Sequence, residues 1–174
     1  MGRNLCLNIG SGQSKFASTG SHEWINVDAN PKWEPEIVAD CRSMPMLLSD
    51  TADIVVLQHV IEHFGLGECD SCIAECQRIL RPGGSLIVTC PDTMQLAKAW
   101  LRKEISDYIY AVSLFGAYMD SELDRHKWPY YAVTLCDTLS KAAAWSQIKT
   151  FDWREIPGSS VKSDWWILGV EAVK

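Results

Sequence analysis

The chain has 174 residues, a length at which one domain can bury a substantial hydrophobic core. Hydrophobic residues make up 47% and charged residues 22% of the composition, as in globular proteins that fold in water. The formal net charge is −6 and no dense basic run occurs, which argues against nucleic-acid binding because that requires clustered Lys and Arg. We therefore expect a single domain over residues 1–174 with no nucleic-acid partner.

The sequence also lacks the signals of secretion and membrane insertion. It contains no apolar stretch of the roughly 20 residues that a transmembrane helix needs, and the first residues lead into an apolar run without a secretory signal region. The seven cysteines are odd in number, and most lie in apolar or helical-looking segments. These features favour a cytoplasmic protein with free thiols and no membrane partner.

In the first half of the chain, apolar runs alternate with short connections. We expect strands at about residues 4–9, 23–28, 36–39, 53–57 and 84–90. The runs 54–57 and 86–88 are continuously apolar, which is typical of parallel strands covered on both faces. Between them, apolar residues spaced three and four apart predict a helix over 68–80, which Pro82 and Gly83 end.

The connections after the first two predicted strands are unusual. Residues 10–22 and 29–35 are rich in Gly, Ser, Pro and Asn and leave no room for a helix of typical length. A parallel crossover usually takes a dozen or more residues. We therefore expect one face of the sheet to be thinly covered near its first strands.

The second half of the chain has a different pattern. The expected elements are a helical segment over 94–115 that breaks near Lys103, a polar and aromatic loop over 116–130, a helix over 131–144, and strand-like runs over 147–155 and 164–173. Pro157, Gly158 and two serines join the last two runs. Turn residues between two strand-like runs favour a hairpin, so at least one strand should be antiparallel.

Glycines and polar side chains follow the first four predicted strands. In chain order they are Gly10 and Gly12, Asp28, Asp40, and the pair Gln58 and His59. In an open α/β sheet, ligands bind outside the carboxyl ends of the strands. Glycine lets a ligand approach the backbone, and a carboxylate can accept hydrogen bonds from both hydroxyls of a ribose. The sequence therefore predicts a nucleoside site at this edge of the sheet.

With these pieces in this order, the sequence resembles the class I S-adenosylmethionine-dependent methyltransferases, specifically their small type-11-like group. The resemblance extends over residues 4 to about 92 and is carried by segments 7–12, 24–28, 39–42, 59–63 and 78–84. It implies an α/β, Rossmann-like sheet of order 3-2-1-4-5-7-6, with the last strand antiparallel and reduced helices after strands 1 and 2. It also implies one methyltransferase domain, with a cofactor-binding half at 4–92 and a substrate-side half with a closing hairpin at 93–174.

The resemblance further implies roles for individual residues. Gly10 and Gly12 would pass under the methionine part of S-adenosylmethionine, Asp28 would bond its ribose, and Asp40 its adenine amino group. The full set of expected cofactor-binding residues is Asn8, Gly10, Ser11, Gly12, Asp28, Ala29, Asp40, Cys41, Gln58 and His59. The candidate catalytic residues are His59 and His126. The expected reaction is O- or N-methylation of a small-molecule or glycan-linked acceptor by a monomer or homodimer, leaving S-adenosylhomocysteine.

The sequence departs from related patterns at two places. Lys15 stands where the dinucleotide fingerprint has its third glycine, which disfavours NAD. No segment before Leu5 provides a substrate cap. An alternative is therefore a non-catalytic S-adenosylmethionine-binding module that needs a partner.

Residues 59–63 also match the H-x-x-E-H pattern of some zinc proteases. The alternative that follows is a zinc metallohydrolase using His59, Glu62 and His63. Because the pattern directly follows a buried strand and no third ligand is marked downstream, we expect no metal. On this interpretation His63 packs or caps near a helix start, and Glu62 braces the loop.

Two further clusters have a structural interpretation beside a functional one. Cys69, Cys72 and Cys76 have metal-like spacing but lack a second pair of ligands, so we expect them on a helix face. His126 lies among charged and aromatic residues that form either a substrate wall or a helix lead-in anchored by Trp128. The sequence leaves both interpretations of His126 open.

Overall fold

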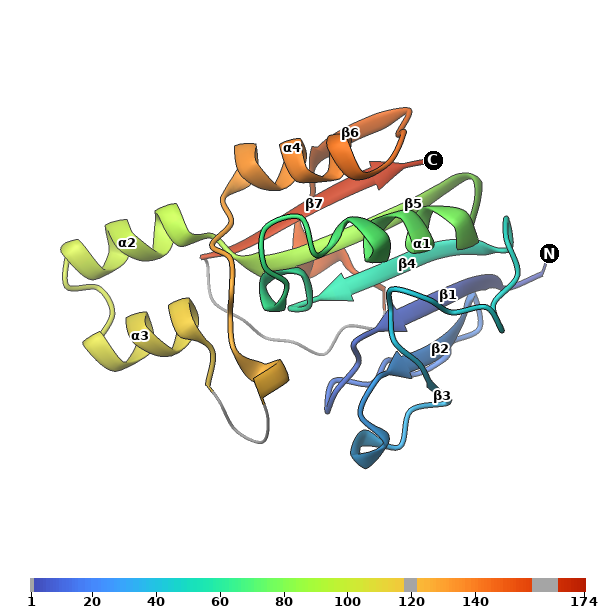
Figure 1. Ribbon diagram of the computed structural model, residues 1–174, viewed down its shortest axis with the longest axis horizontal. Coiled ribbons are helices and arrows are strands. Elements are labelled where there is room, and N and C mark those ends of the chain that lie inside the picture. The colour runs from blue at the N-terminus through green and yellow to red at the C-terminus, as the bar shows by residue number, and fades with distance from the viewer. Residues whose placement is uncertain (1, 118–121, 158–165) are drawn as a thin grey trace.

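The structure, a computed structural model, describes residues 2–117, 122–157 and 166–174 (Figure 1). Within these residues one seven-stranded sheet has the order β3-β2-β1-β4-β5-β7-β6. The strands are β1 Asn4–Ile9, β2 His22–Asp28, β3 Ile37–Val38, β4 Ala52–Gln58, β5 Leu80–Pro91, β6 Gln147–Thr150 and β7 Ile167–Val173. β7 runs antiparallel to both of its neighbours, and the other pairs are parallel. The predicted Rossmann-like fold and strand order are confirmed.

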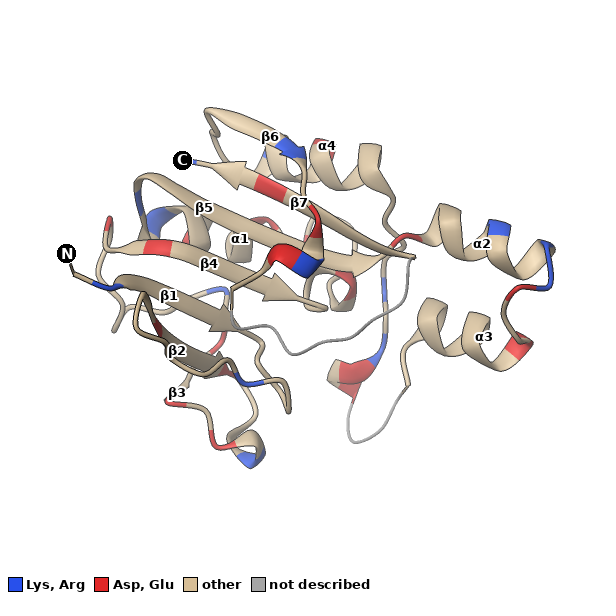
Figure 2. Cartoon of the chain, turned by 180° about the vertical axis from the view of Figure 1, so that it is seen from behind, with Lys and Arg blue, Asp and Glu red and all other residues tan. Residues whose placement is uncertain are grey.

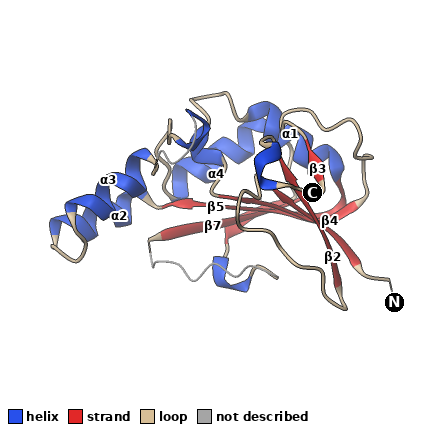
Figure 3. Cartoon of the chain, turned by 90° about the horizontal axis from the view of Figure 1, so that it is seen from below, coloured by secondary structure: helices blue, strands red, loops and turns tan. Residues whose placement is uncertain are grey.

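Two helices pack on the sheet and two project from it. The α-helices are α1 Asp70–Ile79, α2 Thr93–Leu101, α3 Asp107–Phe115 and α4 Ala132–Ala142, and the 3-10 helices are η1 Pro31–Trp33, η2 Ile61–His63, η3 Glu122–Asp124 and η4 Trp153–Glu155. Helices α1 and α4 cover one face, whereas α2 and α3 form a hairpin beyond the end of β5 (Figure 3). The predicted break near Lys103 separates α2 from α3, and Lys103 itself has a positive φ of 60°. No helix among the described residues is long and apolar enough to cross a membrane.

The core lies on both faces of the sheet because the central strands are apolar throughout. On β4, Val55 and Leu57 face the cluster under α1 and α4, and Val56 faces the second cluster on the other side. Alternate residues of a strand point to opposite faces. A continuous apolar run, as expected of a buried parallel strand, therefore supplies side chains to two separate cores, one on each face of the sheet.

A loop replaces the usual crossover helix on the second face. Residues 10–21 contain no helix, and Phe16 from this loop packs edge-to-face on Trp24 of β2, with ring centroids 4.8 Å apart. The buried Asn26 side chain accepts a hydrogen bond from the Phe16 amide at 2.8 Å and donates one to its carbonyl at 3.1 Å. Asn8 donates to Asn26 Oδ1 and to the Ser14 carbonyl, both at 2.9 Å. Side-chain amides thus satisfy backbone groups that a helix would have paired internally.

Some predicted boundaries were wrong. β5 begins at Leu80, directly after α1, so residues 81–84 form an irregularity inside the strand rather than a separate turn. The run 147–155 is a strand only up to Thr150, because η4 follows. The predicted turn after Pro157 lies outside the described residues. All seven cysteines are free thiols, as expected, and Cys72 and Cys76 lie on the buried face of α1.

The role of Asn26 can be tested by replacing it with the similarly shaped Leu. We expect Asn26→Leu to lower the free energy of unfolding by about 3 kcal/mol, since the Phe16 backbone and the Asn8 amide lose buried partners. Urea denaturation measures this. Asn4→Ala, at an exposed position at the start of β1, should change it by less than about 0.5 kcal/mol. Equal effects of the two variants would contradict the proposed role.

Candidate functional site

A cavity of about 530 Å³ lies at the carboxyl ends of the first strands. The residues after β1, β2 and β4 line it, together with residues 39–42 after β3 and the segment around His126. This volume is typical of sites for a single small ligand. The predicted edge of the sheet therefore carries a cavity, and the segment around His126 closes its other side.

The loop after β1 forms the cavity floor at Gly10 and Gly12. Both glycines have positive φ angles, 70° and 48°, which side chains with a Cβ rarely adopt. A Cβ on Gly10 would overlap the Val60 side chain, whereas one on Gly12 would meet no atom within 4 Å. Gly10 is thus required for packing, and Gly12 exposes its backbone to the open cavity.

The Asp28 side chain ties the ends of two neighbouring segments together. Its Oδ2 accepts a hydrogen bond from the Gly12 amide, and its Oδ1 accepts one from the Asn30 amide, both at 2.8 Å. A carboxylate has about four lone-pair sites, so each oxygen can accept a further donor. Asp28 also lines the cavity, so a ligand with paired hydroxyls can reach it.

Asp40 lies on the cavity wall between Ala39 and Cys41. Its carboxylate accepts hydrogen bonds from Arg42 Nε at 2.9 Å and Nη2 at 2.5 Å. The Arg42 guanidinium holds the pKa of Asp40 below its ordinary value. Asp40 is therefore an ionised acceptor whose orientation is fixed by its neighbour.

Of the predicted site residues, Gly10, Gly12, Asp28, Ala29, Asp40, Cys41, His59 and His126 line the cavity. Asn8, Ser11 and Gln58 do not line it. Asn8 and Ser11 are buried, and the amide of Asn8 holds the loop instead. The residues next to these three in the sequence border the cavity instead.

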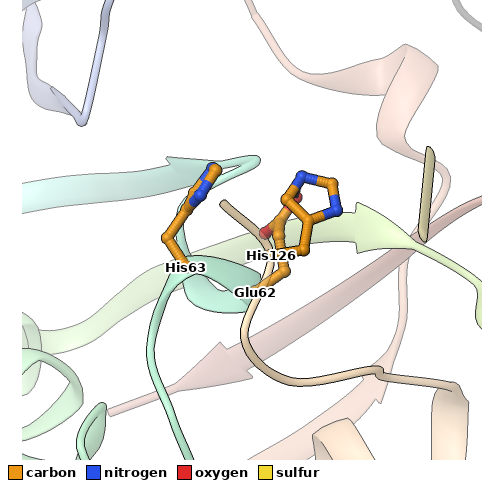
Figure 4. A group of neighbouring side chains, drawn as sticks. All are labelled: Glu62, His63 and His126. Carbon is orange, nitrogen blue, oxygen red and sulfur yellow. Dashed lines mark ion pairs between the residues drawn. The ribbon is translucent and has the colours of Figure 1, made fainter. Parts of the chain in front are cut away.

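Three histidines surround the buried carboxylate of Glu62, whose exposed fraction is 2%. His59 Nδ1 lies 3.1 Å from Glu62 Oε1, and His126 Nε2 lies 3.9 Å from the same oxygen. The rings of His63 and His126 are in edge-to-face contact, with centroids 5.0 Å apart (Figure 4). His59, His63 and His126 all line the cavity, with Glu62 behind them.

The backbone joins these residues from two distant segments. The amides of Lys127 and Trp128 donate hydrogen bonds to the Glu62 carbonyl at 2.7 and 3.2 Å. Glu62 thus braces the loop, and Trp128 packs against the core, as expected of a helix lead-in. His126 lines the cavity, and its role as a substrate wall stays a prediction.

Burial and nearby groups shift the pKa values of Glu62 and His126. Burial alone would raise the pKa of Glu62, but the hydrogen bond from His59 and the nearby imidazoles lower it below its ordinary value. Burial lowers the pKa of His126, which favours a neutral ring. The cluster therefore combines an ionised carboxylate with at least one neutral imidazole.

The H-x-x-E-H pattern does not form the two-histidine helix face of zinc proteases. Residues Ile61–His63 are a 3-10 helix, and His59 precedes it with a φ of 55°. The residues whose ligand atoms lie within 4.8 Å of one another are Glu62, His63 and His126, without His59. The third residue of this group comes from a loop about 60 positions later, so the pattern gives no sign of it.

Several cavity residues were not among the predicted ones. They include Gln13, Asn30, Trp33, Phe64, Leu123 and Lys127. The first four lie within a few residues of predicted positions, so adjacency to a strand end could have indicated them. Lys127 directly follows the predicted His126, whereas Leu123 lies in η3, in the segment before α4 whose position depends on contacts with η2. Figure 2 shows Lys and Arg scattered among acidic residues over the described chain.

The geometry agrees with comparisons to known proteins. Residues 7–88 match the family described as "Methyltransferase domain", and curated protein sequences give no match. A structure of an S-adenosylmethionine-dependent methyltransferase from Archaeoglobus fulgidus has a TM-score of 0.62 at 16% identity, covering 99% of this chain and 87% of that chain. For a "possible histamine N-methyltransferase" from Thermotoga maritima these values are 0.60, 16%, 100% and 84%.

A third structure shares the fold with a ligand bound. It is the 1,6-didemethyltoxoflavin-N1-methyltransferase of Burkholderia thailandensis with S-adenosylhomocysteine, with a TM-score of 0.58 at 14% identity, covering 99% of this chain and 72% of that one. The neighbours share the seven-stranded fold, and the matched family covers the strands that surround the cavity. Residues 7–88 thus match the methyltransferase-domain family, and the chain shares the fold of S-adenosylmethionine-dependent methyltransferases.

Proposed function

We propose that the cavity binds S-adenosylmethionine at its glycine and aspartate end and a small-molecule or glycan-linked acceptor at its histidine end. The observation that carries this proposal is the meeting of Gly12, Asp28, Asp40 and His59, each at or just beyond the carboxyl end of a different strand, in one cavity of about 530 Å³. The transferred methyl group would then lie between the two ends.

At the donor end, each polar group has a matching partner on the cofactor. The open backbone at Gly12 leaves space for the methionine part. Asp28 has unused lone pairs for the ribose hydroxyls. Asp40, oriented by Arg42, can accept the adenine amino group beside Ala39 and Cys41. Asn8, Ser11 and Gln58 would act indirectly, by shaping the segments that carry these groups.

At the acceptor end, His59 and His126 would contact the substrate. A lone pair on an acceptor oxygen or nitrogen forms a bond to the methyl carbon while the carbon–sulfur bond breaks, and S-adenosylhomocysteine leaves. Because the sulfonium is already activated, alignment and exclusion of water supply most of the rate. One structural neighbour is titled a possible histamine N-methyltransferase, and another is a 1,6-didemethyltoxoflavin-N1-methyltransferase with 1,6-didemethyltoxoflavin bound, which supports a small-molecule acceptor.

The proposal is tested by titrating the protein with S-adenosylhomocysteine in a calorimeter and by assaying methyl transfer to a panel of small hydroxyl and amine acceptors. Saturable 1:1 binding together with a methylated product supports the proposal. Binding without a product from any acceptor would favour the alternative of a non-catalytic module. A folded protein that binds no S-adenosylhomocysteine would exclude both.

The ribose contact predicts the effect of removing the Asp28 carboxylate. We expect Asp28→Ala to weaken S-adenosylhomocysteine binding at least about 10-fold, because it removes charge-assisted hydrogen bonds worth about 1.5–3 kcal/mol each. Calorimetry provides the dissociation constants. Asp137→Ala, which removes an exposed carboxylate paired with Lys141 on α4, should leave the affinity unchanged. Unchanged affinity in Asp28→Ala would refute the ribose assignment.

The two glycines should respond differently to the same substitution. Gly10→Ala should lower the free energy of unfolding by about 1–3 kcal/mol, because its methyl group overlaps Val60. Gly12→Ala places its methyl group in open space, so beyond the roughly 1–2 kcal/mol cost of a Cβ at positive φ its effect should be weaker S-adenosylhomocysteine binding. Thermal unfolding and calorimetry separate the two effects. An unchanged affinity in a folded Gly12→Ala protein would show that the cofactor does not pass over this residue.

A further inference from the structure

The cluster of Glu62, His63 and His126 offers three metal-binding side chains at one point of the cavity. One ligand atom from each residue lies within 4.8 Å of the others. Figure 4 shows the side chains approaching from two separate segments, η2 and the lead-in to α4. The hydrogen bonds from Lys127 and Trp128 to the Glu62 carbonyl fix these segments to each other. The convergence is therefore built into the backbone.

Both imidazoles are oriented by backbone carbonyls. His63 Nδ1 lies 3.1 Å from the Arg125 carbonyl, and His126 Nδ1 lies 3.0 Å from the Ser113 carbonyl. A carbonyl can only accept a hydrogen bond, so each Nδ1 carries a proton, and a ring that holds this single proton keeps a lone pair on Nε2. Metal-binding histidines usually have their second nitrogen fixed in this way.

The contact between His126 and Glu62 lacks a group to bridge it. His126 Nε2 lies 3.9 Å from Glu62 Oε1, which is too far for a direct hydrogen bond. Ligands of a tetrahedral Zn²⁺ ion, each about 2.1 Å from the metal, lie roughly 3.4 Å apart. A cation between the two atoms could therefore bind both after a small side-chain movement.

The burial of Glu62 is a second, independent observation. The side chain is almost fully buried, and its Oε2 has no hydrogen-bond partner. Burying an ionised carboxylate costs free energy unless a cation or hydrogen bonds compensate for it. His59 donates to Oε1 and leaves Oε2 unsatisfied.

We propose that Glu62, His63 and His126 bind a divalent transition-metal ion, with Zn²⁺ as the best match. Two imidazoles and a carboxylate are a donor set that suits Zn²⁺, whereas Mg²⁺ and Ca²⁺ prefer oxygen ligands. Three protein ligands leave a further coordination position. Because His63 and His126 line the cavity, this position faces the acceptor end.

The chemical role of the metal, though not the site itself, rests on the proposed methyl transfer. A bound Zn²⁺ can lower the pKa of a coordinated hydroxyl toward neutrality. The acceptor hydroxyl loses its proton to solvent, its oxygen forms a bond to the methyl carbon, and the carbon–sulfur bond breaks with its electron pair on sulfur. The site therefore favours an acceptor with a hydroxyl group. His126 then acts as a ligand and does not take the proton itself.

The test measures metal binding directly. Protein treated with a chelator is titrated with Zn²⁺ alone, and the metal content is determined after dialysis. We expect one Zn²⁺ per chain and no competition from Mg²⁺. The Co²⁺-loaded protein should lack thiolate-to-cobalt absorption, because no cysteine belongs to the donor set. A folded protein that binds no Zn²⁺, or a thiolate absorption band, would overturn the proposal.

Substitutions of Glu62 and of the histidines assign the ligands. Glu62→Gln and His126→Asn should each weaken Zn²⁺ binding by more than about 100-fold, since removing even an outer-shell partner costs 10–100-fold. His59→Asn, which removes a hydrogen bond to Glu62 but no ligand, should retain the ion with about 10–100-fold weaker binding, a smaller loss than the ligand variants show. His22→Ala is the matched control, because this remaining histidine lies at the start of β2.

These variants also decide between outcomes. Retained stoichiometric binding in both Glu62→Gln and His126→Asn, or loss of binding in His22→Ala, would overturn the assignment. Circular dichroism confirms folding, and His63→Asn provides a third ligand variant at a partly exposed position. S-adenosylhomocysteine binding is measured on the metal-free protein in parallel. If that binding fails while Zn²⁺ binds, the proposed function is wrong and the metal site stands.

Discussion

The loop after β1 is held to the sheet by side chains of β2, and both the fold and the cavity depend on this attachment. Asn26 hydrogen-bonds both backbone groups of Phe16, and Asp28 accepts from the Gly12 amide. A helix satisfies its backbone groups internally, whereas a loop against a sheet needs partners from elsewhere. Two polar residues of β2 provide these partners, so the short crossover remains ordered. The same contacts place Gly12 and Asp28 side by side at the cavity.

A second attachment joins the two halves of the chain. The Glu62 carbonyl receives hydrogen bonds from Lys127 and Trp128, and Trp128 packs against the core. These contacts bring the segment before α4 over the residues that follow β4. The wall at the proposed acceptor end is therefore formed by residues that are far apart in sequence. Its geometry depends on these backbone hydrogen bonds rather than on contacts between long side chains.

The buried Glu62 carboxylate connects this architecture to chemistry. A charge this deeply buried needs compensation, and the neighbours that surround it are histidines. Because Glu62 Oε2 has no hydrogen-bond partner, an additional cation is the simplest source of further compensation. A metal ion at this point would stabilise the buried charge and present a coordination position to the cavity. The H-x-x-E-H match in the sequence thus includes two of the proposed ligands, but pairs them with the wrong histidine.

The sequence by itself determined the strand order and the residues at the strand ends where the cavity lies. Apolar runs ending in Gly10, Asp28, Asp40 and His59 predicted four strand ends, and parallel strands place such ends at one edge of a sheet. It also predicted the missing helix, because residues 10–22 are too few and too rich in glycine and serine. Only the tertiary structure decided which side chains face the cavity. Asn8 and Ser11 are both buried, and the Asn8 amide holds the loop. The pairing of Glu62 with His126 was likewise beyond the sequence, because no local periodicity encodes a contact between a strand end and a loop some 60 residues later.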